Sequence, residues 1–248
     1  MPSLREIARE WDANASARCS QIESGKDISH DKILIPAILK QAGSLNGRVV
    51  LDVGCGCGFL TALLGRSAKS AYGIDISRKM IKQAKQRFCT LRNVRFAVAS
   101  VEKYAKHAGS RFHLCVANMS IITMPRIDPV LRAVSTLLVD GGRLIFSISH
   151  PCFWNSYRGD ERVEEFNYLV SHPVTAPFRI TLDPKPLPVP TTYFHRPLSV
   201  YISAIHRTGF QLEHLAEPGP PLDAPSPYRA AFRFPRFLVC SIRKRRRK

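Results

Sequence analysis

Short apolar runs alternate with helical patterns through the first 150 residues of the chain. Runs rich in β-branched residues predict strands at 48–53, 70–75, 94–98, 112–117 and 143–149. Helices are predicted between them at 59–65, 77–88, 101–106 and 129–138. Strands that alternate with helices are typical of a parallel sheet. Because the strands are almost continuously hydrophobic, we expect helices on both faces of the sheet.

The alternation breaks between residues 151 and 192. This segment holds seven prolines, which exclude long helices and central strands. Its aromatic residues favour a packed lid, and a structural wrap over the sheet edge is the alternative. A helix at 197–208, a strand at 210–215 and a final strand at 232–242 are predicted to follow, and Pro235 in the final strand marks a sheet edge or a bulge.

A chain of 248 residues with 45% hydrophobic residues can bury one full core. We predict a single α/β domain with a doubly wound, seven-stranded, mostly parallel sheet. An N-terminal helical cap would span 1–45, with an amphipathic helix at 31–42 that could cap the sheet edge. The further divisions are a core at 46–150, a lid insertion at 151–192, a helix and strand hairpin at 193–242, and a basic tail at 243–248.

Composition narrows the setting in which the protein works. No apolar run approaches the roughly 20 residues that a membrane span requires. Charged residues interrupt the first 14 positions, unlike a signal peptide, so we expect a cytoplasmic chain that starts near Met1. Seven cysteines, scattered and odd in number, predict free buried thiols. Cys55 and Cys57 have no second ligand cluster, so no metal site is predicted.

The net charge of +18 suggests either an acidic partner or only a host whose proteins are basic. Six of the cations lie in the tail at 243–248, and the rest of the chain is basic as well. A terminal charge run is usually a solvated tail, which we favour over a nucleic-acid arm.

A glycine-rich turn follows the first strand directly, as Gly54-Cys55-Gly56-Cys57-Gly58. The carboxyl edge of a strand is where open α/β sheets bind ligands. Phe59 stands where the dinucleotide fingerprint requires glycine, and no phosphate-loop lysine follows, so pyrophosphate binding is disfavoured. Asp52 would repel phosphate and suits an ammonium group. Asp75 ends the second strand, where it can accept hydrogen bonds from both hydroxyls of a ribose. Its alternative role is to cap the next helix, but Ser77 is the more natural residue for that cap.

Four passages resemble the class I S-adenosylmethionine-dependent methyltransferases across nearly the whole chain: VLDVGCGCG at 50–58, GIDIS at 73–77, FHLCVANMSI at 112–121 and LLVDGGRLIFSISHPCF at 137–153. SHPCF together with YFHRPLSVYISAIHRTGF at 193–210 resembles a bacterial subgroup that acts on small molecules.

The resemblance implies S-adenosylmethionine as the cofactor. Asp52 and the loop glycines would hold its methionine part, Asp75 its ribose, and Asn118 and Met119 would lie near the methionine end. The family often has an acid for the adenine amino group where this chain has Ser100. The implied cofactor site comprises Asp52, Gly54, Cys55, Gly56, Gly58, Asp75, Ile76, Met80, Ser100, Val101, Asn118 and Met119.

Methyl transfer to a hydroxyl is helped by a base with a pKa near neutral, which histidine provides. His150 ends the fifth strand and His195 precedes a helix, so each is a candidate base. The alternatives are an orienting hydrogen bond at the lid hinge and a contact at the helix start. Candidate substrate contacts are Trp11, Phe153, Trp154 and Tyr193.

These residues predict an O- or N-methyltransferase for a small aromatic or anionic metabolite. The charge leaves an RNA methyltransferase as the alternative within enzymes, although no RNA-binding module is visible. A cofactor-binding protein without turnover is the third reading.

Overall fold

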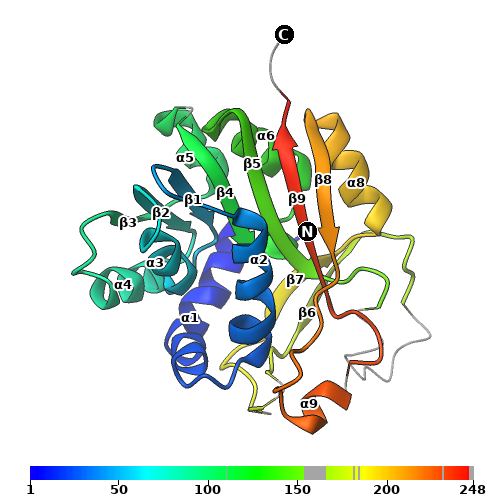
Figure 1. Cartoon of the computed structure of the whole chain (residues 1–248). Helices are drawn as coiled ribbons and strands as arrows, with labels where there is room; N and C mark the ends of the chain where they lie inside the picture. Colours follow the sequence, from blue (N-terminus) through cyan, green and yellow to red (C-terminus); the bar gives the residue numbers. More distant parts are fainter. Residues whose placement is uncertain (110, 154–165, 181, 184, 231, 246–248) are drawn as a thin grey trace.

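A computed structural model describes residues 1–109, 111–153, 166–180, 182–183, 185–230 and 232–245. Within this part of the chain, seven strands form one sheet in the order β3-β2-β1-β4-β5-β9-β8 (Figure 1). The first five strands of that order pair in parallel, and β9 runs antiparallel to both β5 and β8. The predicted fold class is confirmed.

The predicted elements appear close to their expected bounds. The sheet strands are β1 Val49–Val53, β2 Ser70–Asp75, β3 Val94–Val98, β4 Phe112–Asn118, β5 Leu138–Ser149, β8 Phe210–Ala216 and β9 Phe237–Lys244. The helices that connect them are α3 Phe59–Gly65, α4 Arg78–Arg87, α5 Val101–Ala108, the 3₁₀-helix η2 Ile121–Thr123, α6 Ile127–Leu137, α8 Leu198–Arg207 and α9 Ser226–Ala230.

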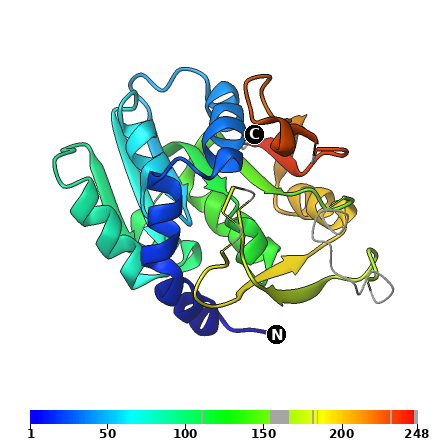
Figure 2. The ribbon, with the colours of Figure 1, turned by 90° about the horizontal axis from the view of Figure 1, so that it is seen from below.

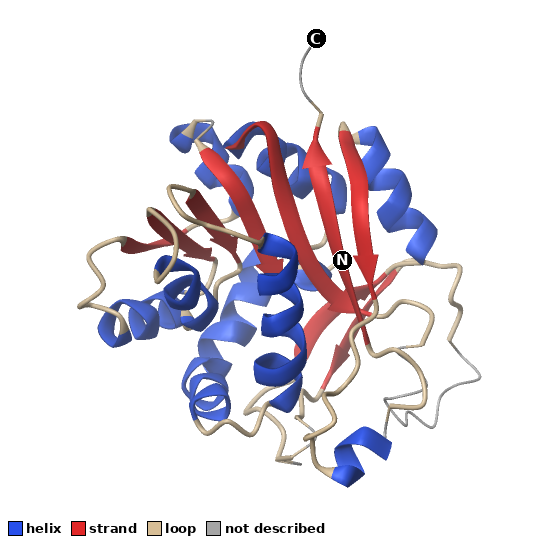
Figure 3. Cartoon of the chain, in the orientation of Figure 1, coloured by secondary structure: helices blue, strands red, loops and turns tan. Residues whose placement is uncertain are grey.

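Helices cover both faces of the sheet, as Figure 3 shows. On one face, buried residues of α5, α6 and α8 pack with Phe146 and Leu238 of the sheet. On the other, α2 Ile35–Ala42 and α3 pack with Ile145 and Val239 of the same two strands. Side chains at neighbouring positions of one strand thus pack into the cores on opposite faces of the sheet. This explains why the strands are almost continuously apolar.

Three predicted boundaries are wrong in detail. The segment 31–42 is a π-helix, η1 Ser29–Leu34, followed by α2, which packs on the sheet face at β5 and β9 and not on an edge. The last strand begins at Phe237, so Pro235 precedes it; a proline lacks the N–H that pairing requires. Arg243 and Lys244 belong to β9 and donate to Gly141 O and Leu138 O, so these two residues are part of the sheet and not of a solvated tail.

The N-terminal cap is a 20-residue helix, α1 Leu4–Glu23. Ser3 and Glu6 form a capping box at its start. Seen from below, α1 (dark blue) lies between α4 and the yellow lid segment (Figure 2). The cap therefore touches both the cofactor half of the domain and the lid.

The proline-rich segment contains one short strand, β6 His172–Ala176, which pairs antiparallel with β7 Thr191–His195. Pro173 is tolerated because this is a two-stranded ribbon outside the main sheet. The sequence analysis excluded central strands from this segment, in agreement with the described residues, but it did not predict this ribbon. It is tied to the cap: Asn14 Nδ2 donates to Val189 O, Val189 N donates to Asn14 Oδ1, and Glu10 accepts from both the backbone and the hydroxyl of Thr192.

The prediction of free thiols is wrong for two of the seven cysteines. Cys19 of α1 and Cys57 of the glycine-rich loop form a disulfide, whereas Cys55, Cys89, Cys115, Cys152 and Cys240 are free. Sequence spacing could not reveal this pair, because only the docking of the cap brings the two residues together. Among the described helices, we find none that combines the length and the apolarity needed to span a bilayer.

Candidate functional site

The sheet has a topological switch point between β1 and β4. The chain moves outward from β1 through β2 and β3, then returns to place β4 on the other side of β1. Loops after these two strands diverge, which opens a crevice at their carboxyl ends. A cavity of about 680 Å³ lies here, within the size range of small-ligand sites.

Two positions of the glycine-rich loop require glycine for different reasons. A Cβ on Gly54 would lie 2.3 Å from Ser120 Cβ, in the loop after β4, whose hydroxyl donates to Val53 O. Gly56 has φ +52°, and a Cβ there would meet no atom within 4 Å. Since Gly56 lines the cavity, that side chain would occupy ligand space.

Asp75 sits at the end of β2, and both its oxygens accept a backbone hydrogen bond. Gly56 N donates to Oδ2 at 2.9 Å and Ser77 N to Oδ1 at 2.8 Å. Ser77 itself caps α4 through Met80 N, as predicted. A carboxylate oxygen has a second lone pair, so Asp75 can still accept two ribose hydroxyls. Burial raises the pKa of Asp75, while the two backbone donors oppose that rise.

Asp52 is the second carboxylate of the cavity and is 2% exposed. Thr61 Oγ1 donates to its Oδ2 at 2.7 Å. Burial raises the pKa of Asp52 to about 7, with the Thr61 hydrogen bond opposing and the Asp75 charge adding to the rise. A cationic group nearby would favour the ionised form, which makes this wall of the cavity suited to a positive ligand.

The remaining predicted cofactor residues also line the cavity. These are Gly54, Cys55, Ile76, Met80, Ser100, Val101, Asn118 and Met119. Gly58 caps α3 with φ +82° and supports the loop from outside, since a Cβ there would lie 2.7 Å from the Phe96 ring. Ser100 Oγ accepts from Lys103 N and caps α5. Asn118 Oδ1 accepts from Ser147 Oγ at 2.6 Å, which fixes the strand end next to Met119.

The cap and the lid form the outer wall of the cavity. Trp11 and Tyr193, both predicted substrate contacts, line it. Phe178 of the lid lines it too and packs edge-on against Trp11, with ring centroids 6.4 Å apart. Arg18 lies 5.0 Å above the Phe178 ring. Aromatic and cationic groups therefore line the same cavity as the carboxylates of Asp52 and Asp75.

The two predicted bases lie away from this wall. Neither His150 nor His195 is among the described residues that line the cavity. Cys152 N donates to His150 Nδ1, so Nε2 carries the proton and donates to Glu217 at 2.7 Å. His195 Nε2 lies 2.8 Å from Tyr168 O, and burial lowers the pKa of His195. The His150 contacts match its orienting alternative, whereas His195 contacts the proline-rich segment and not the helix start.

Phe153, a predicted substrate contact, stacks on Phe234 with ring centroids 5.2 Å apart and also packs against His150. It is absent from the described lining of the cavity. Trp154, the fourth predicted substrate contact, lies outside the described residues.

Among the cavity residues that the sequence analysis missed, His30 and Glu102 bear on the chemistry. His30, in the π-helix η1, lines the cavity, and its Nδ1 lies 2.7 Å from Asp31 Oδ1. A π-helical turn is often found at functional sites but has no sequence signal. Glu102 lines the cavity beside Ser100 and supplies an acid two positions beyond the expected one. In the described residues, no group of His, Cys, Asp and Glu is placed to hold a metal.

Residues 50–142 match a family model described as a methyltransferase domain. A ubiquinone biosynthesis O-methyltransferase of Bordetella avium is 33% identical over 113 residues, which cover 44% of this chain and 46% of the relative. The chain thus matches about half the length of its curated relatives.

Solved structures agree over a longer stretch. A protein of Listeria monocytogenes assigned as an S-adenosylmethionine-dependent methyltransferase has a TM-score of 0.69 and 25% identity, covering 88% of this chain and 98% of its own. Magnesium protoporphyrin IX methyltransferase of Synechocystis PCC 6803, with bound S-adenosylhomocysteine, shares the fold at a TM-score of 0.57 and 17% identity over 85% of this chain and 81% of its own. Residues 50–142 are thus similar to a methyltransferase domain, and the chain shares its fold with S-adenosylmethionine-dependent methyltransferases.

Proposed function

We propose that this protein transfers a methyl group from S-adenosylmethionine to an oxygen or nitrogen atom of a small aromatic or anionic metabolite. One observation carries the proposal: a single cavity is bounded by the glycine-rich loop and Asp75 on one side and by Trp11 and Tyr193 of the cap and lid ribbon on the other. Both partners of a transfer reaction would share that enclosed space.

The residues present fit the cofactor. Gly56 leaves space that a side chain would fill, Asp75 retains lone pairs for a diol, and Asp52 favours a cation. Glu102 or Ser100 would accept from the adenine amino group. When bound, the cofactor supplies a methyl group activated by a sulfonium. The protein then has to orient an acceptor in line with that methyl group and exclude water.

The outer wall supports the choice of acceptor. Trp11, Phe178 and Tyr193 offer ring faces to an aromatic compound, and Arg179 of the lid also lines the cavity. Arg179 favours an acceptor with a carboxylate or an acidic phenol, whereas the charge of Arg18 is paired with Asp27. A cavity of about 680 Å³ has the size of a small-molecule site and favours a small acceptor over RNA, although the overall charge of +18 keeps RNA as the alternative.

Within this function we assign the base role to His30. Asp31 accepts the Nδ1 proton of His30, which leaves Nε2 able to take a proton from an acceptor hydroxyl. The earlier candidates, His150 and His195, would act only after release from their present hydrogen bonds. The exposed free thiols of Cys89 and Cys152 support a reducing compartment such as the cytoplasm.

Titration calorimetry with S-adenosylmethionine tests the cofactor, and incubation of labelled S-adenosylmethionine with a panel of phenols and aromatic carboxylic acids tests transfer. Asp75→Asn keeps the side-chain shape but removes the charged acceptor. We expect it to weaken cofactor affinity by about 2–3 kcal/mol, because hydrogen bonds to a charged group are worth roughly that much. Asp140→Asn, at an exposed position, is the matched control. Saturable binding of NADH without binding of S-adenosylmethionine would refute the proposal.

A further inference from the structure

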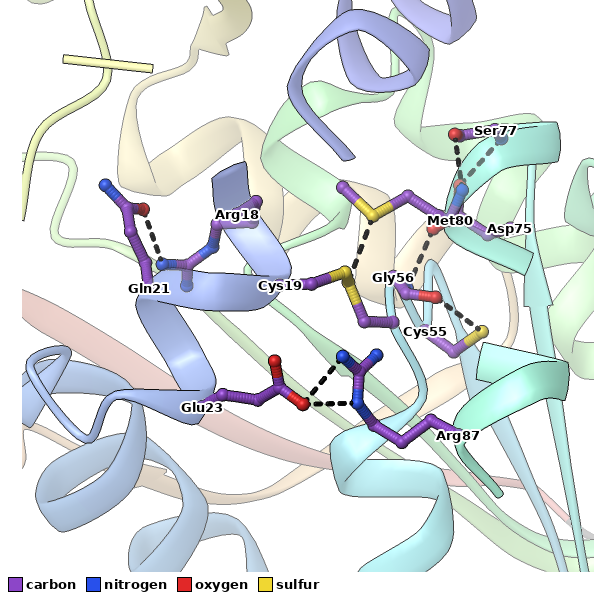
Figure 4. Close-up of a disulfide and its surroundings, with 11 residues drawn as sticks. Arg18, Cys19, Gln21, Glu23, Cys55, Gly56, Asp75, Ser77, Met80 and Arg87 are labelled. Carbon is purple, nitrogen blue, oxygen red and sulfur yellow. Dashed lines mark hydrogen bonds and ion pairs between the residues drawn. A yellow bond between two sulfur atoms is a disulfide. The ribbon is translucent and has the colours of Figure 1, made fainter. Parts of the chain in front are cut away.

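The Cys19–Cys57 disulfide connects two elements that bound the cofactor cavity. Cys19 lies in the last turns of the cap helix α1, and Cys57 lies in the glycine-rich loop, 38 residues further along the chain (Figure 4). Their Cα atoms are 5.9 Å apart, and each residue is 2% exposed. Trp11 and Arg18 of the same helix line the cavity, as does Cys57. The bond therefore fastens one wall of the cavity to another.

Besides the disulfide, a buried ion pair between Arg18 and Asp27 and a small apolar cluster hold this part of the cap. The disulfide belongs to a small buried cluster with Ala15 and Met80, separate from the two main cores. Met80 Sδ lies 3.4 Å from Cys57 Sγ. Glu23 at the end of α1 also forms an ion pair with Arg87. Ion pairs at the protein surface contribute little to stability. Without the covalent bond, the end of α1 rests on few buried apolar groups, which is the pattern of a segment that opens locally.

Asp12 provides one further anchor at the middle of the helix. It accepts from Ser77 Oγ at 2.6 Å and from Lys79 N at 2.9 Å. This contact lies about two helical turns before Cys19. It can serve as a pivot when the end of the helix moves, because it is independent of the sulfur atoms.

The other thiols indicate that the bond is reversible. Cys89 and Cys152 are exposed and free, a state that persists in a reducing compartment. A disulfide between buried cysteines in such a protein is usually transient or redox-sensing. A purely structural staple would be expected in a chain that pairs its exposed cysteines as well.

We propose that Cys19 and Cys57 are a redox lock on the cofactor site. In the disulfide form, α1 is held over the cavity and exchange of cofactor is slow. In the dithiol form, the end of α1 opens and exchange is fast. This inference rests on the proposed function, because it regulates the same site.

Forming the disulfide requires an oxidant such as hydrogen peroxide, and breaking it requires a reductant such as a dithiol. One thiolate attacks hydrogen peroxide, the O–O bond breaks, and a sulfenic acid and hydroxide form; the second thiol displaces the sulfenic oxygen as water to make the S–S bond. The two thiols lose two electrons in total and the peroxide becomes two waters. In reverse, a dithiol such as dithiothreitol supplies two electrons and becomes a disulfide itself. Since Cys57 lines the cavity, reagents reach the pair by that route, and a bound cofactor would shield it.

The test compares peroxide-treated and dithiothreitol-treated full-length protein, with thiols counted by alkylation and intact mass. Dissociation of S-adenosylhomocysteine is followed by surface plasmon resonance, and hydrogen exchange of residues 4–23 is measured without ligand. We expect reduction to accelerate dissociation by roughly tenfold or more, in the range of ordinary coupling between sites. Exchange should also become faster in α1, most of all after Asp12.

Cys19→Ser should behave like reduced wild type under both treatments, and Cys89→Ser should keep the full redox response. Equal dissociation rates and equal exchange in the two forms would overturn the lock while leaving the proposed function intact. A Cys19→Ser variant that still responds to peroxide would overturn it as well. If neither form binds S-adenosylhomocysteine, the proposed function fails and the lock on its cofactor site fails with it; opening of α1 on reduction would then show only that the disulfide restrains the cap.

Discussion

The side chains around the cavity differ in how many hydrogen-bonding partners they already have. Both ring nitrogens of His150 are engaged, by Cys152 N and by Glu217. His30 engages Nδ1 with Asp31. A base has to exchange a proton with the acceptor, so a ring with an available nitrogen at the cavity is better suited than one fixed on both sides.

His30→Ala should therefore lower the methyl transfer rate by about 10²–10⁴-fold, the usual contribution of a general base, while cofactor affinity changes little. His150→Ala, the matched comparison, should lose thermal stability but keep the pH profile of the rate. The measurement is kcat against pH with the best acceptor from the panel. A His30→Ala enzyme with the wild-type rate and profile would return the role to His195 or to an acceptor that is already deprotonated.

At the scale of elements, α1 connects two parts of the protein that would otherwise be independent. Asn14 is fully buried and exchanges two hydrogen bonds with the backbone of Val189, while Glu10 binds Thr192. On its other side, the helix docks on α4 and on the glycine-rich loop. A substitution in the cap helix should therefore alter the stability of the lid.

Asn14→Ala should loosen the lid, because it removes two hydrogen bonds and leaves the N–H and C=O of Val189 without that partner. The cost is about 1–3 kcal/mol, from roughly 0.5–1.5 kcal/mol for each hydrogen bond. Limited proteolysis should cut residues 166–192 much faster than in wild type, and bound cofactor should slow the cut. Ser16→Ala, exposed on the same helix, is the control. Equal cleavage of both variants would mean that the lid is held by other contacts.

The elements also show what the sequence could reveal. Strands and loop glycines were predicted because burial on both faces produces continuous apolar runs, and because a ligand crevice follows directly from strand order. Asp52 and Asp75 were found through their position at strand ends. His30 and the Cys19–Cys57 pair were not, since a π-helical turn and a cap docked over long sequence distance leave no local pattern. The β6–β7 ribbon was missed because the many prolines of this segment argue against strands. A short strand that pairs on one side only can still accommodate a proline.

At the scale of the whole molecule, the buried carboxylates connect stability to pH. The pKa of Asp52 is raised by burial to about 7 in the folded protein, above its value of about 4 in an unfolded chain. Between these values the folded state holds a proton that the unfolded state has released. The free energy of unfolding therefore falls as pH rises from about 4 to about 7 and levels off above that.

Urea unfolding of the cofactor-free protein between pH 5 and pH 8 tests this coupling. Asp52→Asn cannot ionise, so the stability of wild type relative to this variant should fall by roughly 2 kcal/mol as pH rises across that interval. Asp140→Asn, which alters an exposed carboxylate, should follow wild type. A constant difference between wild type and Asp52→Asn would show that Asp52 is already ionised at pH 5.

The position of β9 also has a consequence during translation. A ribosome completes β1 to β5 early, and these strands can pair as soon as they emerge. Strand β8 emerges before β9, yet β9 lies between β5 and β8. Until residues 237–244 are synthesised, β8 therefore has no strand to pair with, and the edge of β5 stays unpaired. Ile145, Phe146 and Ile148 of β5 are buried in the finished fold. An unpaired, apolar edge is a template for aggregation. A message cut short before residue 237 should consequently yield a product that depends on chaperones, even though its glycine-rich loop is already complete.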